Sequence, residues 1–504
     1  MSPVPFPATL KPVKKVIVIG GGIAGLSAGV YARKCGFDVT VLESHAVPGG
    51  NCTSWRRGGY LFEGGMHWLS GSDKNEPLNR LWRHIGALDD GVKIRRGEPY
   101  LEYGDTPVRL YRDVDQTERH LLEVSPADAA EIRKFCGNIR RVKNLAMPVA
   151  DLRGVRTTKK NRPPLTLLFA ALSALGVMRA FSKISPQQYA DRFSHEEIRE
   201  MLRDLTNGKG GVLPLFFTLG TLARGDGGFP EGGSLPFVRR IVKTFASLGG
   251  ELLCGTRAER VIIEGGKATG VVAAGRLLQA DAVIVASDTM AVDGLFDAPP
   301  KARWLDKMRA AAAPTMCTFV SLGVNADLAK YPHGFVFKPA RPIGHADQNC
   351  VWLGVNNYAS DPAYSPAGKT ALTAILSGDT YDFWKRAKAE GRYDGEKRKI
   401  AEAVTEAVEA RMPEARGKVE VVDVATPLTY ERYCGNWKGS WMTELDAAGP
   451  NFRRYPATIK GTGGVYFAGQ RMMPPGGLPV ALMSGRAAVQ RLCRDTGTLF
   501  ASEE

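Results

Sequence analysis

The chain has 504 residues, 44% of them hydrophobic and 24% charged, which predicts two or three folded domains and excludes a disordered or fibrous protein. Its net charge of +15 requires an anionic partner such as nucleic acid, a membrane surface or an acidic substrate, and the sequence holds no nucleic-acid-binding module. The eight cysteines form no CxxC pair, the seven histidines form no metal motif, and no signal peptide precedes the first strand. We therefore expect reduced thiols, no metal site and a cytoplasmic protein, with no apolar run reaching the ~20 residues of a spanning helix.

The first dozen residues contain four prolines and are expected to form a loose arm. The next segment, VIVIG, predicts a buried parallel strand, and the turn Gly20-x-Gly22-x-x-Gly25 opens a helix through Ala32. Gly20 permits the tight turn, Gly22 lets a pyrophosphate approach the backbone, and Gly25 lets the helix pack closely on its strand. This order predicts a dinucleotide site at the positive end of the helix.

A second strand, DVTVLE, ends in Glu43, eighteen residues after Gly25. A carboxylate there can accept hydrogen bonds from an adenosine ribose and would repel a 2′-phosphate, which disfavours NADP. The passage VPGGNCTSWRRGGYLFEGGMHW follows, and its paired glycines allow a second close approach to a bound molecule. A short helix is expected over 76–89.

From about 95 to 224 the pattern changes to short strands and then helices. FPEGGSLPFVRR predicts a turn and a helix, and the β-rich segment after it ends in ADAVIVAS, whose small residues Ala286 and Ser287 suit a strand end that faces a nucleotide. Residues 301–455 mix strands with a helix over 393–412. The closing segment supplies a strand, a glycine-rich loop and a helix over 479–495.

The nucleotide-binding pattern thus occurs at the start, the middle and the end of the chain. We predict an α/β protein with a Rossmann-like cofactor domain built from residues 1–95, 225–300 and 456–504. Residues 96–224 and 301–455 would form an inserted α+β substrate domain.

Four passages resemble the phytoene desaturase, carotenoid isomerase and retinol saturase flavoproteins, within the wider monoamine-oxidase-like fold. They are GGGIAGLSAG with Glu43, PGGNCTSWRRGGYLFEGGMHWLSG, FPEGGSLPFV and GGVYFAGQRMMPPGGLPVALMSGR. The resemblance implies FAD in place of an exchanging NAD. It also implies that Gly469 faces the diphosphate, Ala258 meets the adenine, and Gly477, Leu478 and Pro479 border the flavin. The full set expected at the cofactor is Gly20, Gly22, Ile23, Ala24, Gly25, Glu43, Ser44, Gly49, Gly50, Asn51, Gly65, Met66, His67, Ala258, Ala286, Ser287, Gly469, Gln470, Gly477, Leu478 and Pro479.

Two positions depart from the pattern of that family. Asn51 stands where Arg or Lys usually follows the paired glycines, so one positive charge near the diphosphate is missing. The segment GGMHW replaces an acidic or serine-containing version beside the flavin. We expect His67 and Trp68 near the isoalloxazine, with His67 as a candidate catalytic proton donor and a plain wall-lining histidine as the alternative.

The closing helix would direct its free N–H groups at the pyrimidine end of a flavin and favour the reduced form. The chain has only one complete dinucleotide motif, so no second motif is left to hold NAD(P)H beside the flavin. Electrons are therefore expected to pass to or from O₂, a quinone or another diffusing partner. Hydride transfer on an apolar isoprenoid depends on positioning more than on acid–base groups, which fits the absence of an obvious triad. Aromatic residues in 381–384 and 429–441 could line an apolar substrate tunnel or could be core.

The stretch 153–183 places five cations (Arg153, Arg156, Lys159, Lys160 and Arg162) before a 14-residue apolar run, and Arg179 and Lys183 after it. Such a segment can lie in the headgroup interface on the inner face of a membrane, or it can be a buried helix with solvated cations.

The preferred interpretation is an FAD-dependent oxidoreductase that desaturates, saturates or isomerises C–C bonds of a hydrophobic, isoprenoid substrate. A flavin amine oxidase on the same scaffold is the second. The third is a prenyl-lipid escort without redox chemistry, which the phosphate-binding glycines and Glu43 disfavour.

Overall fold

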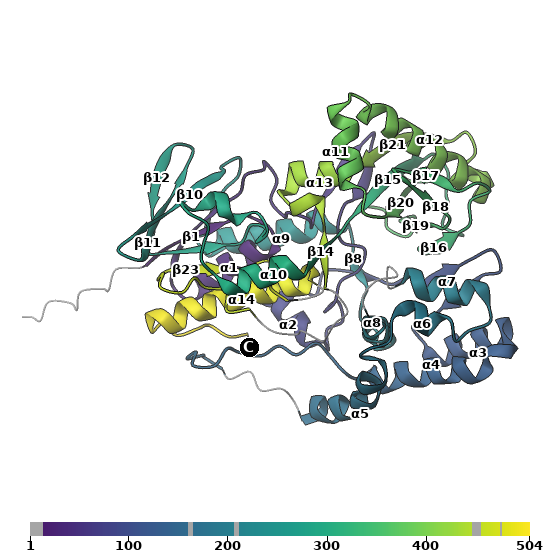
Figure 1. The fold of residues 1–504 in the computed structure, drawn as a ribbon, viewed down its shortest axis with the longest axis horizontal. Helices are drawn as coiled ribbons and strands as arrows, with labels where there is room; N and C mark the ends of the chain where they lie inside the picture. The colour runs from purple at the N-terminus through teal and green to yellow at the C-terminus, as the bar shows by residue number, and fades with distance from the viewer. Residues whose placement is uncertain (1–13, 160–164, 206–210, 446–454, 474–475, 504) are drawn as a thin grey trace, which may run out of the picture.

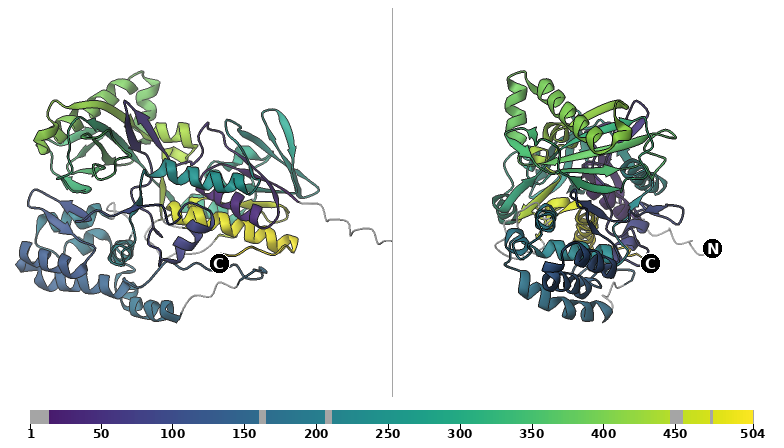
Figure 2. Two further views of the ribbon diagram at one scale, coloured as in Figure 1. Left: turned by 180° about the vertical axis from the view of Figure 1, so that it is seen from behind. Right: turned by 90° about the vertical axis from the view of Figure 1, so that its right-hand side faces the viewer.

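The computed structural model describes residues 14–159, 165–205, 211–445, 455–473 and 476–503, so the expected N-terminal arm lies outside the described residues. It is a mixed α/β protein with three visible parts (Figure 1). A parallel sheet with its helices lies at one end, a larger sheet lies at the other, and a group of helices lies beside the larger sheet. The two further views in Figure 2 show the same separation.

The parallel sheet takes its strands from distant parts of the chain. Its order is β23 (Val465–Phe467), β13 (Ala282–Val285), β1 (Lys15–Ile19), β2 (Asp38–Leu42) and β9 (Glu251–Leu253). Ile17 pairs with Val283 on one side and with Thr40 on the other. The first, middle and last segments that share the nucleotide-binding pattern therefore meet in one sheet.

Both faces of this sheet are covered, which explains why β1 is apolar from Val16 to Ile19. Val16 and Val18 pack in one hydrophobic cluster and Ile17 and Ile19 in another. The first face carries α1 (Ile23–Lys34), α9 (Ser234–Ser247) and α14 (Gly477–Thr496). The second face carries the antiparallel sheet β10 (Ala258–Glu264), β11 (Lys267–Ala273) and β12 (Arg276–Gln279), with α10 (Arg303–Ala311).

The larger sheet joins the two inserted regions. Its order is β21 (Val419–Ala425), β15 (Cys317–Val324), β20 (Thr370–Ser377), β19 (Leu353–Asn357), β16 (Gly334–Phe337), β6 (Leu101–Tyr103) and β7 (Val108–Leu110). Phe335 of β16 pairs in parallel with Glu102 of β6. The helices α11 (Tyr381–Ala389), α12 (Tyr393–Arg411) and α13 (Pro427–Cys434) lie on the same side of the molecule (Figure 1). The predicted domain boundaries themselves remain a prediction.

The helical group has its own core, in which Phe135, Tyr189 and Phe216 are buried against one another. Its helices are α3 (Val114–Val124), α4 (Ala129–Val142), α5 (Leu165–Phe181), α6 (Pro186–Ala190), α7 (Glu196–Asp204) and α8 (Leu213–Ala223). None of the helices in the described part of the chain is long and apolar enough to cross a bilayer.

Shorter elements complete the fold. The helix expected over 76–89 is α2 (Pro77–His84), and it ends early because Gly86 adopts a left-handed conformation (φ +76°). The remaining strands pair in twos: β3 (Ser54–Arg57) with β4 (Tyr60–Glu63), β5 (Ile94–Arg95) with β8 (Phe229–Pro230), β14 (Ala312–Thr315) with β22 (Met442–Leu445), and β17 (Ile343–His345) with β18 (Gln348–Cys350).

Candidate active site

The glycines between β1 and α1 serve two different physical purposes. A Cβ on Gly25 would lie 1.8 Å from the carbonyl oxygen of Gly20, so this position has no room for a side chain. A Cβ on Gly22 would meet no atom closer than 3.9 Å, and Gly22 has ordinary extended angles (φ −71°, ψ 178°). Neither the fold nor the backbone conformation therefore requires glycine at position 22, whereas a ligand that approaches the chain there would.

The N-terminus of α1 is open toward the same space. Among the described residues no side chain caps this helix, and its first turn holds no acidic residue. The amides of the first turn are consequently left without a side-chain partner, which would suit the anionic ligand expected from the sequence.

Glu43 is placed by the backbone around it. Its side chain is buried and accepts hydrogen bonds from the amides of Gly21 (2.7 Å) and His45 (2.8 Å). The paired glycines lie on the opposite side of the turn, where the Gly49 amide donates to the Gly21 carbonyl at 2.9 Å. Gly49 has φ +128°, a conformation that favours glycine.

The other predicted segments reach the same place. Ala286 and Ser287 follow β13, and the amide of Ala286 donates to Ile19 at 2.8 Å. The Gly469 amide donates to Ser484 Oγ at 2.9 Å, which ties the loop after β23 to α14. α14 begins at Gly477, two residues before the predicted start, and Gly476 before it has φ +96° and offers no side-chain cap. Pro474 and Pro475 of this loop lie outside the described residues.

One cavity of about 1700 Å³ connects these segments. All the residues predicted at the cofactor line it except Gly25 and Met66, which are packed beneath its wall. Its volume exceeds the ~300–1,000 Å³ of a site for one small ligand, so it has room for a cofactor and a substrate together. The glycine whose Cβ meets open space, the uncapped helix and the buried carboxylate fit the phosphate and ribose groups of a dinucleotide.

The remainder of the cavity is largely apolar. The helical group contributes Leu145, Met147, Ala171, Leu175, Met178 and Phe217, and the side of the larger sheet contributes Phe319, Val424, Leu428, Tyr430 and Trp441. The rings of Phe319 and Tyr430 lie 5.7 Å apart. This part of the wall supports recognition of a hydrophobic ligand.

The two aromatic segments differ in which of the two expected alternatives, tunnel wall or core, they follow. Tyr430, Tyr433 and Trp441 of segment 429–441 line the cavity. None of the residues 381–384 does so, because Trp384 is turned into the core under the larger sheet and the Tyr381 hydroxyl donates to Glu431 at 2.7 Å. The two segments are both rich in aromatic residues, and only the tertiary orientation distinguishes them.

His67 lines the cavity beside Phe319, with their ring centroids 5.6 Å apart. Its Nδ1 receives a hydrogen bond from Asn356 Nδ2 at 3.0 Å and lies 3.4 Å from the Tyr358 hydroxyl. Burial and the neighbouring His333 lower the pKa of His67 to about 4. The ring is therefore neutral near pH 7, which favours a hydrogen-bonding role over proton transfer from an imidazolium. Its catalytic role remains a prediction.

A buried carboxylate holds the loop that precedes His67. Glu63 accepts hydrogen bonds from the amides of Gly65 (3.0 Å), Met66 (3.1 Å) and Ser234 (2.9 Å), and from the Tyr364 hydroxyl at 3.1 Å. Its own burial raises the pKa of Glu63. Glu63 thus sets the path of the GGMHW segment without lining the cavity.

Sequence reasoning missed one ion pair in the wall. Arg471 and Asp288 line the cavity and form a bidentate pair with two N···O distances of 2.9 Å, and both side chains are almost fully buried. Arg471 also donates to Ser440 Oγ at 2.7 Å. Asp288 directly follows the predicted Ser287, and Arg471 directly follows the predicted Gln470. Their positions next to two predicted site residues were the one sequence signal that could have identified them.

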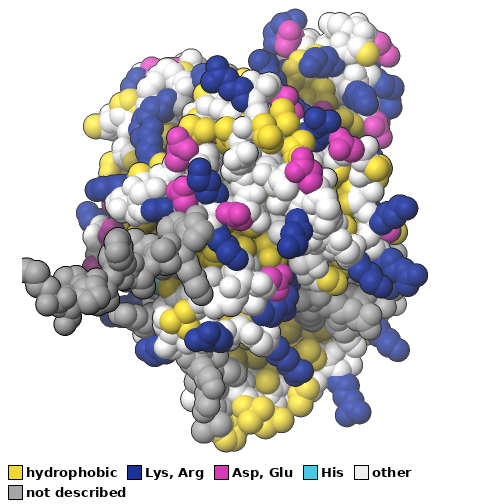
Figure 3. Space-filling view, turned by 90° about the vertical axis from the view of Figure 1, so that its left-hand side faces the viewer, with side chains coloured by type: hydrophobic (Ala, Val, Ile, Leu, Met, Phe, Trp, Pro, Cys, Tyr) yellow, Lys and Arg dark blue, Asp and Glu magenta, His cyan; other side chains and the backbone are white. Residues whose placement is uncertain are grey.

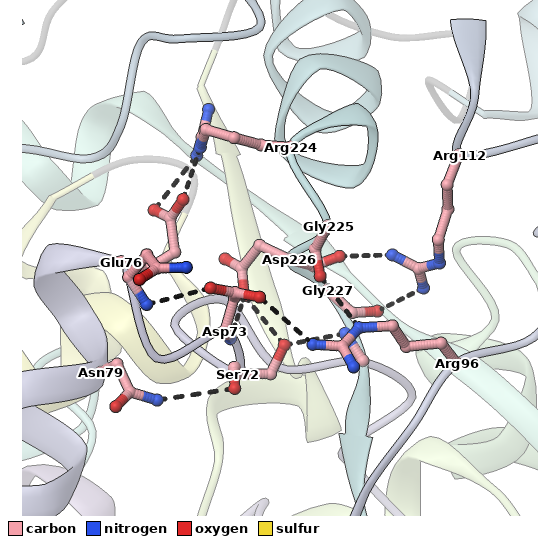
Figure 4. A network of polar contacts seen from close by, with 12 residues as sticks. Ser72, Asp73, Glu76, Asn79, Arg96, Arg112, Arg224, Gly225, Asp226 and Gly227 are labelled. Atoms are coloured by element: carbon pink, nitrogen blue, oxygen red, sulfur yellow. Dashed lines mark hydrogen bonds and ion pairs between the residues drawn. The ribbon is translucent and has the colours of Figure 1, made fainter.

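Asn51, which replaces the expected cation, lines the cavity and accepts a hydrogen bond from Asn436. Trp68 also lines the cavity and packs against Gly227. Gly227 belongs to a polar network that joins the segment after Trp68 to the end of α8 (Figure 4).

The centre of that network is Asp226, which is 1% exposed. Its carboxylate accepts from the amides of Gly71 (2.7 Å) and Asp73 (3.0 Å) and from Ser72 Oγ (2.8 Å). Figure 4 shows Arg112 reaching the backbone oxygens on the other side of this loop. The network thus ties the segment after Trp68, itself a residue of the cavity wall, to the end of α8.

Comparisons with known proteins agree with this geometry. A family model described as flavin containing amine oxidoreductase matches residues 23–493. The all-trans-zeta-carotene desaturase of Myxococcus xanthus is 25% identical over 96% of this chain and 94% of its own length. The prolycopene isomerase of Daucus carota is 22% identical over 95% of this chain and 80% of its own length.

Solved structures share the fold. An oxidoreductase from Methanosarcina mazei superimposes with a TM-score of 0.60 at 18% identity, covering 94% of this chain and 100% of its own. A putrescine oxidase bound to putrescine has a TM-score of 0.59 at 17% identity, covering 96% of this chain and 99% of its own.

These findings confirm the resemblance to carotenoid desaturases and isomerases, and they identify FAD as the cofactor of an enzyme, which sets aside the lipid-escort alternative. The chain belongs to the flavin containing amine oxidoreductase family.

Proposed function

We propose that this FAD-dependent oxidoreductase acts on C–C bonds of a hydrophobic, isoprenoid or carotenoid-like substrate, by desaturation, saturation or redox-neutral isomerisation. The observation that carries the proposal is the apolar section of the cavity, which continues from the dinucleotide-binding section and is lined from both inserted regions. The relatives named as carotenoid desaturase and isomerase support it.

The residues that would hold FAD are those that the three segments bring to the cavity. The α1 amides beside Gly22 would bind the diphosphate, Glu43 the ribose and the backbone at Ala258 the adenine. The start of α14 at Gly477 to Pro479 would border the ring. When bound, FAD would supply hydride transfer, and O₂ or a quinone is the proposed electron acceptor where the reaction is a desaturation.

The chain's own contribution to the chemistry would be to position the substrate and exclude water. Phe319, Tyr430 and Trp441 contribute aromatic surfaces, and Val424 and Leu428 add aliphatic side chains to the same wall. Such a surface aligns an unsaturated chain by contact without a charged group.

A flavin amine oxidase is the second candidate. It is favoured by the family model described as flavin containing amine oxidoreductase and by the putrescine oxidase fold.

Anaerobic photometry separates the two candidates. The flavin absorbance near ~450 nm is followed while the holoenzyme is mixed with an isoprenoid polyene or with simple amines. The proposal expects the polyene to shift or bleach the flavin band and the amines to leave it unchanged. Rapid bleaching by an amine would assign the second function.

We also propose that α5 rests on an anionic lipid surface. Its residues Leu168, Phe169, Leu172 and Leu175 are 58%, 69%, 54% and 53% exposed. Figure 3 shows hydrophobic side chains gathered at the lower end of the molecule, where α5 lies in Figure 1. The exposed Arg179 and Lys183 follow them in the chain and would meet anionic headgroups, each contributing ~1 kcal/mol. The exposed Arg153, Arg156 and Lys159 precede α5 in the chain, in a segment that pairs with Phe500. Leu175 also lines the cavity, so a lipid substrate could enter beside the same helix.

Vesicle flotation tests this surface. Replacing Leu168, Phe169 and Leu172 by Gln should lower binding to vesicles with anionic lipid at least ten-fold, because each exposed side chain loses most of its transfer free energy. Leu277→Gln on β12 is the matched control, since Leu277 is equally exposed (54%) and lies on another part of the molecule. Equal binding of the triple variant and the control would refute the membrane contact, and loss of a dimer in the triple variant would assign α5 to contact between copies.

A further inference from the structure

The imidazole of His67 is held from one edge only. Its Nδ1 is contacted by Asn356 Nδ2 at 3.0 Å and by the Tyr358 hydroxyl at 3.4 Å. Asn356 lies on β19 and is fixed there by pairing with Gly334 and Thr373 on the neighbouring strands. Nε2 makes no hydrogen bond to a residue in the described part of the chain, and His67 lines the cavity.

We propose that Asn356 positions His67 as the tautomer with its proton on Nε2, so that this N–H serves as a hydrogen-bond donor to an oxygen or nitrogen acceptor of the bound ligand. An Nδ1 that accepts from Asn356 cannot carry the ring proton of a neutral imidazole, and the proton must then be on Nε2. As far as it concerns the ligand, the inference rests on the proposed function.

The charged groups around His67 support a neutral ring. His333 packs near it but donates its Nδ1–H to the Asn357 carbonyl (2.8 Å), and burial lowers the pKa of His333 as well. Glu63 is the carboxylate of the preceding loop, and its hydrogen bonds go to Gly65, Met66, Ser234 and Tyr364. No described carboxylate therefore faces Nδ1 to reverse the tautomer or to stabilise the imidazolium.

A single N–H donor in an apolar wall discriminates between ligands. A hydrocarbon bound against His67 would leave the donor unpaired, whereas a hydroxyl or carbonyl group would accept its hydrogen bond. The acceptor belongs either to an oxygenated isoprenoid substrate or to FAD itself, and both present the same chemistry to Nε2.

The tautomer is measured directly by NMR of holoenzyme labelled with ¹⁵N-histidine, with His67→Phe used to assign the signal. The proposal expects one protonated nitrogen, Nε2, between pH 6 and 9. Two results would overturn the proposal. One is a proton on Nδ1, which would be found if the Asn356 amide were inverted, and the other is an imidazolium at pH 6. This readout does not depend on activity, so it stands apart from the outcome of the proposed function.

Variants test the role of the donor. His67→Gln keeps an N–H group near the position of Nε2, His67→Phe keeps only the ring shape, and Asn356→Asp can accept from Nδ1 and so favour the other tautomer. Each holoenzyme is titrated with geranylgeraniol and with the hydrocarbon that lacks its hydroxyl. We expect the native protein to prefer the alcohol about five-fold, His67→Gln to keep most of the preference, and His67→Phe to lose it.

For Asn356→Asp the preference should vanish at pH 8 and return on acidification, because the new carboxylate raises the pKa of His67 and the imidazolium regains N–H on Nε2. Asn356→Ala, which adds no charge, should show no such return. If His67→Phe leaves the alcohol preference intact but shifts the flavin spectrum, the acceptor is FAD. If it changes neither the preference nor the spectrum, the proposed donor role is wrong.

Discussion

Replacing Gly22 by Val should abolish FAD retention while leaving the fold intact. A Cβ at this position meets no atom within 3.9 Å, and the backbone angles suit any residue, so the free energy of unfolding of the apoprotein should fall by less than about 1 kcal/mol. The valine methyl groups would occupy the space in front of the α1 amides. Each charge-assisted hydrogen bond lost there is worth ~1.5–3 kcal/mol, so losing two weakens FAD binding by roughly 10²–10⁴-fold.

The assay is the ratio of FAD to protein after purification, together with the urea midpoint of each apoprotein. Gly344→Val is the matched control, because a Cβ there meets nothing within 4 Å and Gly344 lies on β17, away from the cavity. Normal FAD content in Gly22→Val would refute the placement of the diphosphate. A collapse of the apoprotein would refute the claim that position 22 is free of packing constraints.

Gly25→Ala should instead destabilise the fold, because its Cβ would fall 1.8 Å from the Gly20 carbonyl oxygen. Circular dichroism should show unfolding at lower urea concentrations than for the native protein, with or without added FAD. Asp226→Asn should lower the free energy of unfolding by about 2–3 kcal/mol, because an amide replaces a carboxylate that accepts from Gly71, Ser72 and Asp73, and a urea midpoint equal to that of the native protein would contradict this. The pKa of His67 is about 4 in the folded protein, and its ordinary value is 6.5. Between these two pH values the unfolded chain binds a proton at His67 that the folded protein does not bind. The free energy of unfolding therefore falls as the pH drops from 6.5 toward 4. His67→Phe should reduce that slope by up to ~1.4 kcal/mol per pH unit in urea titrations at pH 5 and 6, and an unchanged slope would show that His67 is not buried in its neutral form.

The dinucleotide-binding part could be predicted because its signals are local. Strand, glycine turn, helix and Glu43 follow one another within thirty residues, and each obeys a short-range rule. The position of Ala286 was expected because ends of parallel strands meet at one edge of a sheet, whereas that of Gly469 was expected from the resemblance to the flavoprotein family.

The rest depends on contacts that no local rule contains. Asn356 lies 289 residues from His67, and Arg471 lies 183 residues from Asp288. Whether Trp384 or Tyr430 faces the cavity depends on how α11 and α13 are rotated on the larger sheet, and both lie in similar aromatic sequence. The pairing of β6 with β16, which unites the two inserted regions, likewise has no signature in either strand.

The measurement that tests the central claim most directly is mass spectrometry of the lipids that copurify with the holoenzyme. The account predicts an isoprenoid enriched over its share of the host membrane, and loss of that enrichment once the apolar section near Val424 is filled by Val424→Phe. A bound lipid fraction with the same composition as the host membrane, in a protein that retains its FAD, would contradict it.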